Sequence, residues 1–233
     1  MTDIYRKRRA IIFSILTIFI SGLVFINIPN QTKTSSNAES AKVLGVTTLA
    51  IKSLDGLQIK DKAPNIDYSR DKFGAGWKKI SGCDTRNIIL NRDLTDVTID
   101  DNCNVLSGTL NDPYTGKIIQ FKRGSGTSSM IQIDHVVSLS NAWQTGAQLM
   151  TLPKRIELAN DPLELLAVDG SANQQKSDGD AENWLPTNKS FRCQYVARQI
   201  AVKIKYLLWV TKPEHDAIQN VLIKCPNQML PSA

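Results

Sequence analysis

The sequence predicts a mixed α+β domain organised around two β-strands followed by a short helix. In residues 131–139, apolar and polar side chains alternate up to the adjacent Asp134 and His135, which is typical of a strand. Residues 163–168 give a second, largely apolar strand that an Asp-Gly pair ends, and residues 171–176 start a short helix directly after it. We expect a β-hairpin before this ββα unit, helices after it, and an apolar helix at the N-terminus.

The length and composition are those of a globular protein with one main domain. The chain has 233 residues, which is enough for one core and accessory segments. Its 42% hydrophobic and 21% charged residues are not typical of a disordered chain. Half of the formal net charge of +6 lies in the first ten residues, so the remainder is only weakly basic. This charge is compatible with a polyanionic substrate but does not identify one.

The N-terminus has the pattern of an export signal. Basic residues at 6–9 precede an uncharged apolar run at 10–28, which at ~1.5 Å per residue nearly spans a hydrocarbon core of ~30 Å. Because the basic flank stays inside, the rest of the chain is expected outside the cytoplasm. A cleaved signal peptide and a retained membrane anchor both remain open, and the length of the run favours the anchor. We assign residues 1–30 to this signal, 31–61 to a tether, and 62–228 to the main domain.

The cysteine count agrees with export. The chain has four cysteines and no Cys-x-x-Cys pair, so two disulfides are more plausible than a zinc site. Three pairings are possible in principle. We favour the one that joins nearby elements, which pairs Cys83 with Cys103 and Cys193 with Cys225.

Turn and cap residues predict the remaining elements. Pro113 and Gly116 lie between two strand-like segments, so we expect a hairpin there. Thr211 precedes Pro213 and is expected to cap the last helix. The expected segments are a short element at 47–54, strands at 105–110 and 117–121, and helices at 141–150, 153–159, 193–210 and 213–224.

The polar residues of the ββα unit are those that phosphodiester hydrolysis requires. A neutral histidine can take the proton from water, and a divalent cation can hold the phosphate and the leaving oxygen. The chain has only two histidines, and His135 is the one beside an acid in a strand. One carboxylate and one amide oxygen suffice for a hard cation when water and phosphate complete its shell. Asp134 and Asn173 supply that pair, and Lys176, one turn after Asn173, is expected to steady the phosphate.

These segments together resemble the exported bacterial HNH endonucleases, which are related to the nuclease domain of GmrSD-type restriction enzymes. The likeness covers roughly residues 68–225. It implies a ββα-metal nuclease fold in which His135 is the general base and Asp134 and Asn173 bind a single divalent cation. We expect this cation to be Mg²⁺, with Mn²⁺ or another divalent ion as the alternative. The likeness is carried by residues 133–143, 159–163, 165–170 and 184–186, by Asn173 and Lys176, and by the segments at 83–87 and 192–193.

One position departs from the HNH pattern. Such sites have a middle Asn at the start of the second strand that orients the base, and the corresponding residue here is Glu164. Its backbone carbonyl is one candidate for holding the His135 ring, because a histidine Nδ1–H commonly donates to a backbone oxygen. Asn160, four residues earlier, is the other candidate for this role.

The sequence is compatible with two functions from different classes. The first is a nuclease that acts on DNA, or alternatively RNA, with Arg86 and Arg92 as further candidates for phosphate contacts, since a guanidinium fork matches phosphate oxygens. The second is a non-catalytic, membrane-tethered nucleic-acid-binding protein with a degenerate HNH fold. A metalloprotease is disfavoured because no His-Glu-x-x-His occurs. No oligomer signal is visible, so a monomer is expected.

Overall fold

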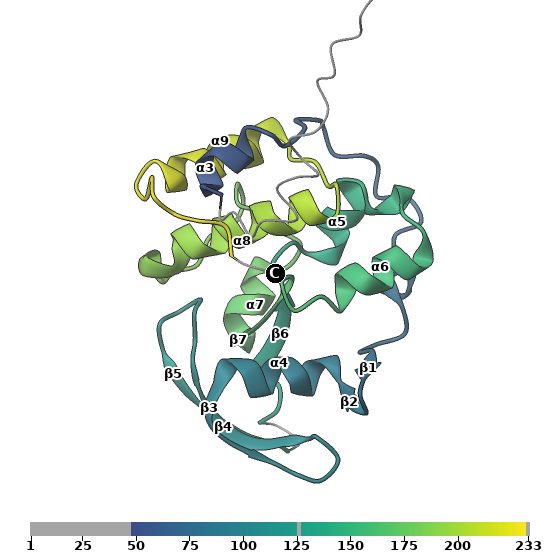
Figure 1. Cartoon of the computed structure of the whole chain (residues 1–233), viewed down its shortest axis with the longest axis vertical. Helices are drawn as coiled ribbons and strands as arrows, with labels where there is room; N and C mark the ends of the chain where they lie inside the picture. Colours follow the sequence, from purple (N-terminus) through teal and green to yellow (C-terminus); the bar gives the residue numbers. More distant parts are fainter. Residues whose placement is uncertain (1–47, 125–126, 232–233) are drawn as a thin grey trace, which may run out of the picture. The chain divides into compact units, whose positions relative to one another are not determined.

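The computed structural model describes residues 48–124 and 127–231, all of which lie in the compact unit Thr47–Ala233. The expected export signal at residues 1–30 and most of the expected tether lie outside the described residues. The described part is, as predicted, a mixed α+β structure of small sheets and several helices (Figure 1).

The predicted succession of strand, strand and helix is present in the middle of the domain (Figure 1). Strand β6 (Ile131–His135) pairs antiparallel with β7 (Leu165–Asp169). Helix α7 (Gly170–Lys176) begins directly after β7. The Asp169 side chain accepts a hydrogen bond from the Ala172 backbone N–H at 2.8 Å and so caps the first turn of this helix.

The predicted hairpin belongs to a second, three-stranded sheet. Strand β4 (Val105–Asn111) pairs antiparallel with β5 (Ile118–Lys122), and β3 (Leu94–Ile99) pairs with the other edge of β4. Helix α4 (Thr85–Asp93) leads into β3 and contacts both β6 and β7. The sequence analysis predicted neither α4 nor β3. Before α4 lie the short paired strands β1 (Lys79–Ile80) and β2 (Cys83–Asp84).

The β6–β7 sheet separates two apolar cores, because successive side chains of a strand point to opposite faces. Ile133 faces a core formed with α4 and the three-stranded sheet. Leu166 faces the larger core, to which the C-terminal helices also contribute side chains. The pairing of Asp134 with Leu166 puts Asp134 on the second face, and His135 therefore lies on the first.

Helices cover the second face of the ββα unit, and two of them are shorter than predicted. The helix expected at residues 141–150 is divided at Gly146, where φ is +132° and a Cβ would lie 3.3 Å from the Trp209 ring. The helix expected at 193–210 ends earlier, and Leu207 beyond it has φ +53°. The elements are η1 (Arg70–Phe73), α5 (Leu139–Gln144), η2 (Ala147–Leu149), α6 (Leu152–Ala159), η3 (Lys189–Phe191), α8 (Arg192–Lys205) and α9 (Lys212–Leu222).

Helix α3 (Ala50–Leu54) lies in the expected tether but is part of the folded domain. Ala50 and Leu54 are fully buried in the larger core, where α3 contacts α8 and α9. The Ala50 backbone N–H also donates to the Gln228 carbonyl at 2.8 Å. The folded domain therefore begins before residue 62, where the sequence analysis places its start.

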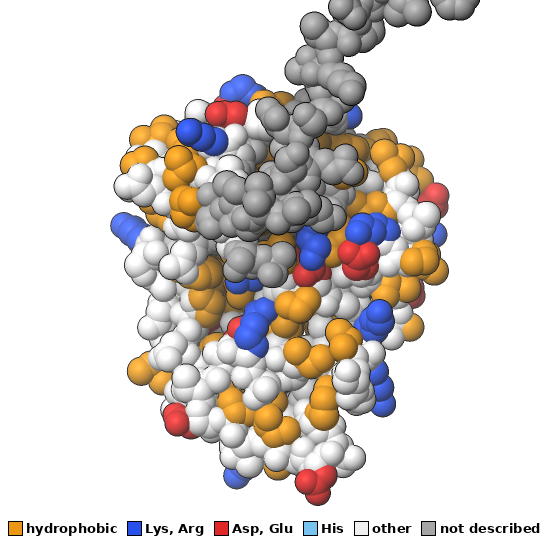
Figure 2. All heavy atoms as spheres, in the orientation of Figure 1, with side chains coloured by type: hydrophobic (Ala, Val, Ile, Leu, Met, Phe, Trp, Pro, Cys, Tyr) orange, Lys and Arg blue, Asp and Glu red, His pale blue; other side chains and the backbone are white. Residues whose placement is uncertain are grey.

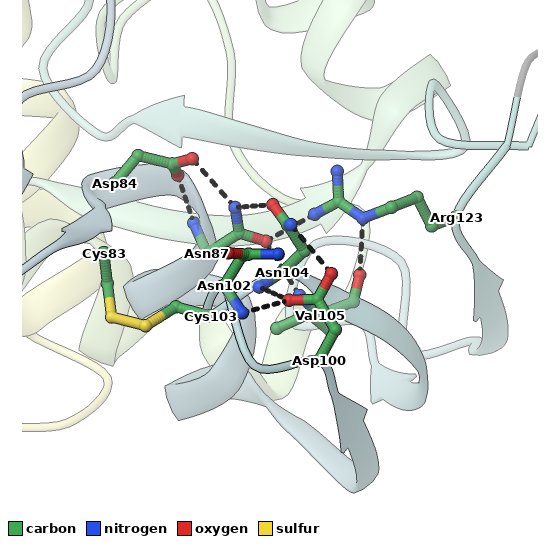
Figure 3. The surroundings of a disulfide bond; sticks show 9 residues. All are labelled: Cys83, Asp84, Asn87, Asp100, Asn102, Cys103, Asn104, Val105 and Arg123. Atoms are coloured by element: carbon green, nitrogen blue, oxygen red, sulfur yellow. Dashed lines mark hydrogen bonds between the residues drawn. A yellow bond between two sulfur atoms is a disulfide. The ribbon is translucent and has the colours of Figure 1, made fainter.

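Two disulfides are present, in the pairing that the sequence analysis favoured, and no cysteine is free. They join Cys83 to Cys103 and Cys193 to Cys225. The first connects β2, directly before α4, to the turn between β3 and β4 (Figure 3). Asn87 of α4 strengthens this connection, since its Oδ1 accepts hydrogen bonds from the Val105 backbone N–H at 2.9 Å and from Arg123 Nη2 at 2.5 Å.

The face drawn in Figure 2 does not by itself identify a functional site. On the face drawn in Figure 2, basic and acidic side chains are interspersed. Within residues 48–124 and 127–231, no helix is both long and apolar enough to cross a membrane, and the apolar run at 10–28 lies outside that part. The site is therefore located from cavities and from the side chains that line them.

Candidate active site

Two cavities meet at His135, where β6 ends. The larger has a volume of about 380 Å³ and the smaller about 110 Å³. The expected base, His135, and the two expected metal ligands, Asp134 and Asn173, lie around the larger cavity. Its full lining is Tyr68, Arg70, Trp77, Arg86, Gln132, Ile133, Asp134, His135, Ser138, Leu139, Asn173, Ser177 and Asp178.

Asp134 and His135 reach the same cavity although they lie on opposite faces of β6. All four residues at 132–135 line it, so the cavity follows the edge of β6 that is not paired with β7. The strand also ends directly after His135. At the end of a strand, an acid and a neighbouring histidine can serve one site. In the interior of a regular strand, their side chains would point to opposite faces.

Two donors from different elements hold the Asp134 carboxylate. Lys176 Nζ, at the end of α7, donates to Oδ1 at 2.9 Å, and the Tyr114 hydroxyl, from the turn between β4 and β5, donates to Oδ2. Burial raises the pKa of Asp134, whereas Lys176 and Tyr114 both favour its charged form. The two contacts fix the orientation of the carboxylate and offset part of the cost of burying it.

Lys176 does not face the cavity. It is 1% exposed, and its ammonium group also donates to the His135 backbone carbonyl at 2.7 Å. A phosphate could reach Nζ only by displacing Asp134 or this carbonyl. The geometry therefore argues against the expectation that Lys176 contacts phosphate, and its observed contacts instead position Asp134.

The His135 ring is held in one tautomer. Nε2 lies 3.0 Å from the Ala159 carbonyl oxygen, and because that oxygen can only accept, Nε2 carries the proton and Nδ1 keeps its lone pair. The Trp77 ring lies nearly parallel to it, with 5.8 Å between the ring centroids. Burial lowers the pKa of His135 to about 3, so the imidazole is neutral near pH 7 and can accept a proton.

Neither candidate for the middle-Asn role forms a hydrogen bond with the His135 ring. The Glu164 backbone carbonyl accepts from the Val136 N–H at 2.9 Å, and its Oε2 accepts from the Val137 N–H at 3.2 Å. Glu164 thus holds the chain directly after His135, whereas the Ala159 carbonyl holds the ring through Nε2 and not through Nδ1. Burial raises the pKa of Glu164 well above its ordinary value, and its Oε1 has no hydrogen-bond partner.

Asn160 positions the segment that contains Trp77. Its Oδ1 accepts from the Lys78 backbone N–H at 2.8 Å, and its Nδ2 donates to the Ile156 carbonyl at 2.9 Å. Asn160 therefore ties the chain beside Trp77 to the end of α6, next to the Ala159 carbonyl that binds His135.

Asn173 brings an amide oxygen to the larger cavity. Its Nδ2 donates to Gln132 Oε1 at 2.8 Å, so Oδ1 is the atom left to bind a ligand. Asp134 and Asn173 together offer one carboxylate and one amide oxygen, which fits a hard divalent cation that takes its other ligands from water and substrate. Among residues 48–124 and 127–231, no three His, Cys, Asp or Glu side chains are grouped so that they could hold a metal ion.

Only one of the two arginines expected to contact phosphate lies at the site. Arg86 lines the larger cavity, and its Nη2 donates to the Ser128 and Ile131 carbonyls. Arg92 lines neither cavity. Its nitrogens are bonded to Asp93 and to the carbonyls of Pro162 and Leu165.

Sequence reasoning missed four contributors to the site: Arg70, Trp77, Tyr114 and the Ala159 carbonyl. All four come from segments that are distant in sequence from β6 and approach it only through tertiary packing. Local periodicity carries no signal for such contacts. The second histidine, His215, is half-buried beside Asp216 on α9 and lines neither cavity.

Comparison with known proteins agrees with this reading at the level of the family. The family model described as GmrSD restriction endonucleases, C-terminal domain, matches residues 84–221, which is more than half of the chain. A protein from Arthroderma benhamiae described as an uncharacterized secreted protein is 37% identical over 209 residues, covering 88% of this chain and 96% of that protein. No solved structure matches.

These matches qualify the expectations about origin and location. The relative comes from a fungus, whereas the sequence analysis noted a resemblance to bacterial enzymes. The secreted relative and the two disulfides fit an exported protein. From the match over residues 84–221, we conclude that the chain belongs to the family of the GmrSD restriction endonuclease C-terminal domain.

Proposed function

We propose that this chain is a metal-dependent endonuclease of the HNH type that hydrolyses phosphodiester bonds in DNA, or alternatively RNA. The observation that carries the proposal is the grouping of Asp134, His135 and Asn173 around one cavity at the end of a ββα unit. Membership in a family of restriction endonuclease domains supports a nucleic-acid substrate.

In the proposed reaction His135 is the general base. Nδ1 accepts the proton of the attacking water, while the Nε2–H bond to the Ala159 carbonyl keeps the ring in place and stabilises the imidazolium that forms. A positioned base of this kind typically accelerates a reaction by about 10²–10⁴-fold.

A divalent cation, when bound, would hold the scissile phosphate and stabilise the leaving oxygen. Asp134 and Asn173 are the proposed ligands, with Mg²⁺ expected and Mn²⁺ as the alternative. Tyr114 and Lys176 orient Asp134, and Arg86 provides positive charge at the same cavity.

We also propose that the enzyme acts outside the cytoplasm. The two disulfides and the secreted relative support export. If the apolar run at residues 10–28 is retained after export, it would attach the domain to the outer face of the membrane.

One observation favours the alternative of a non-catalytic nucleic-acid-binding protein. Asp134 is 5% exposed, and both of its oxygens already accept hydrogen bonds from protein donors. A site closed in this way would bind nucleic acid without turnover. The two proposals differ in whether the protein cleaves nucleic acid when a divalent cation is present.

Plasmid cleavage with Mg²⁺, and with a chelator in its place, tests the proposal. Asp134→Asn is a better variant than Asp134→Ala, because alanine would leave the buried Lys176 ammonium without its partner. We expect Asp134→Asn and Asn173→Ala to need more Mg²⁺ for the same rate of cleavage. Asp101→Asn and Asn91→Ala, at exposed positions, are the matched controls.

The outcome distinguishes the two functions. Cleavage that stops on chelation supports the nuclease. Binding of DNA without cleavage at any Mg²⁺ concentration would contradict the nuclease and favour the binding protein. Cleavage by either site variant at the unchanged Mg²⁺ requirement would refute the ligand assignment.

A further inference from the structure

Arg70 stands where the two cavities meet. It lines both of them, as do His135, Trp77 and Leu139. Arg70 lies outside the region matched by the family model, which begins at residue 84.

Arg70 differs from the other arginines of residues 48–124 and 127–231. Its side chain is exposed and has no hydrogen bond or ion pair with the protein, and Asp178, which lines the same cavity, makes no ion pair with it. Each of the others donates to a protein oxygen; these are Arg86, Arg92, Arg123, Arg155, Arg192 and Arg198.

The backbone that presents Arg70 is nevertheless firmly anchored. Phe73, three residues later in η1, is buried in the larger core. The Lys72 carbonyl accepts a hydrogen bond from Arg155 Nε at 2.6 Å, and the Tyr68 ring lies against Phe73 and Trp143. An anchored backbone with an unpaired guanidinium favours a ligand contact, because the backbone keeps the side chain beside the cavity while its donors remain free.

We propose that Arg70 binds a backbone phosphate of the nucleic acid next to the bond that is cleaved. The inference rests on the proposed nuclease function and adds a substrate contact to it. A guanidinium fork can give two parallel hydrogen bonds to phosphate oxygens, and such charge-assisted bonds are among the strong ones in proteins. Its place beside His135 puts this contact near the attacking water.

The test compares Arg70→Gln with Lys72→Gln in the full chain. Lys72 is exposed on the same 3₁₀ turn, so the control removes the same charge from the same segment. A charge-assisted hydrogen bond contributes about 1.5–3 kcal/mol, so Arg70→Gln should lower kcat/KM by about 10–100-fold. The kcat/KM of Lys72→Gln should remain close to that of the unchanged chain. Arg70→Lys should recover part of the kcat/KM that Arg70→Gln loses.

A second measurement separates substrate binding from catalysis. DNA binding is measured with a chelator present, in a His135→Ala background, over a range of salt concentrations. Loss of one phosphate contact should reduce the slope of log K against log salt by about one for Arg70→Gln. The Lys72→Gln slope should not change.

The outcomes distinguish this inference from the proposed function. If the chain cleaves DNA and Arg70→Gln behaves like Lys72→Gln in both measurements, Arg70 is not a phosphate ligand and the nuclease proposal stands. If the unchanged chain neither binds nor cleaves DNA, the nuclease proposal fails and this inference fails with it.

Discussion

At the scale of single residues, the site is defined by how one buried carboxylate is held. Asp134 lies between the Lys176 ammonium and the Tyr114 hydroxyl, and Lys176 also binds the backbone of His135. Because Tyr114 comes from the turn of the hairpin, the three-stranded sheet contributes directly to the orientation of a proposed metal ligand. Removing the Tyr114 hydroxyl should therefore affect cation binding more than it affects the fold, whereas removing Lys176 would leave the buried Asp134 carboxylate without its charged partner.

The variant Tyr114→Phe, which removes only the hydroxyl group, tests whether this donor affects cation binding. The ring still fills its buried position between Trp184 and Tyr195, but Asp134 Oδ2 loses its donor. We expect weaker Mn²⁺ binding, measured by calorimetry without substrate. Phe191→Leu, a change in the same aromatic group that leaves the hydroxyl in place, is the control. Equal Mn²⁺ affinity in Tyr114→Phe and the unchanged chain would show that the hydroxyl has no positioning role.

Glu164 is expected to position the backbone after His135 and to take no part in proton transfer. Glu164→Gln keeps an oxygen that can accept from the Val137 N–H, so cleavage should be largely retained. Glu164→Ala leaves that buried N–H without a partner, which costs about 1–3 kcal/mol of unfolding free energy. Urea unfolding and cleavage rates check both variants. A large loss of rate in a stable Glu164→Gln would mean that the carboxyl group itself reacts.

At the scale of elements, the sequence predicted the parts whose periodicity is regular. Strand β6 was predicted from alternation, and β7 from a largely apolar run that the Asp169-Gly170 pair ends directly before the helix. Helix α4 was missed because its sequence has little apolar periodicity, and its buried side chains are recognised only from its packing against β6 and β7. The site residues in β6 and α7 were predicted because they lie in these regular elements. The site residues that approach from distant segments were not predicted from the sequence.

The disulfide at the start of α4 should stabilise the fold through chain entropy. Cys83 and Cys103 are separated by 20 residues, and closing a loop of this order stabilises a protein by roughly 3 kcal/mol. The double variant Cys83→Ala with Cys103→Ala should therefore unfold at lower urea concentration. The double variant Cys193→Ala with Cys225→Ala, which opens a loop of 32 residues, should also unfold at lower urea concentration. Unchanged midpoints in both would contradict a stabilising role.

At the scale of the whole molecule, the larger core is completed by a segment that the sequence analysis assigned to the tether. Leu54 of α3 is fully buried there, so Leu54→Ala should destabilise the chain by about 2–5 kcal/mol. Leu207→Ala is the matched control, because that leucine is 88% exposed. Thermal unfolding of both variants provides the comparison. Equal stability of the two would mean that α3 does not contribute to the core.

The molecule as a whole is interpreted as a nuclease whose base is His135, and the rate of DNA cleavage by His135→Ala tests that claim most directly. It is measured with Mg²⁺ beside His215→Ala, which changes the histidine that lines neither cavity. We predict a loss of about 10²–10⁴-fold for His135→Ala, with folding and DNA binding retained, and a rate close to the unchanged chain for His215→Ala. An undiminished rate in a folded His135→Ala would contradict the proposed mechanism.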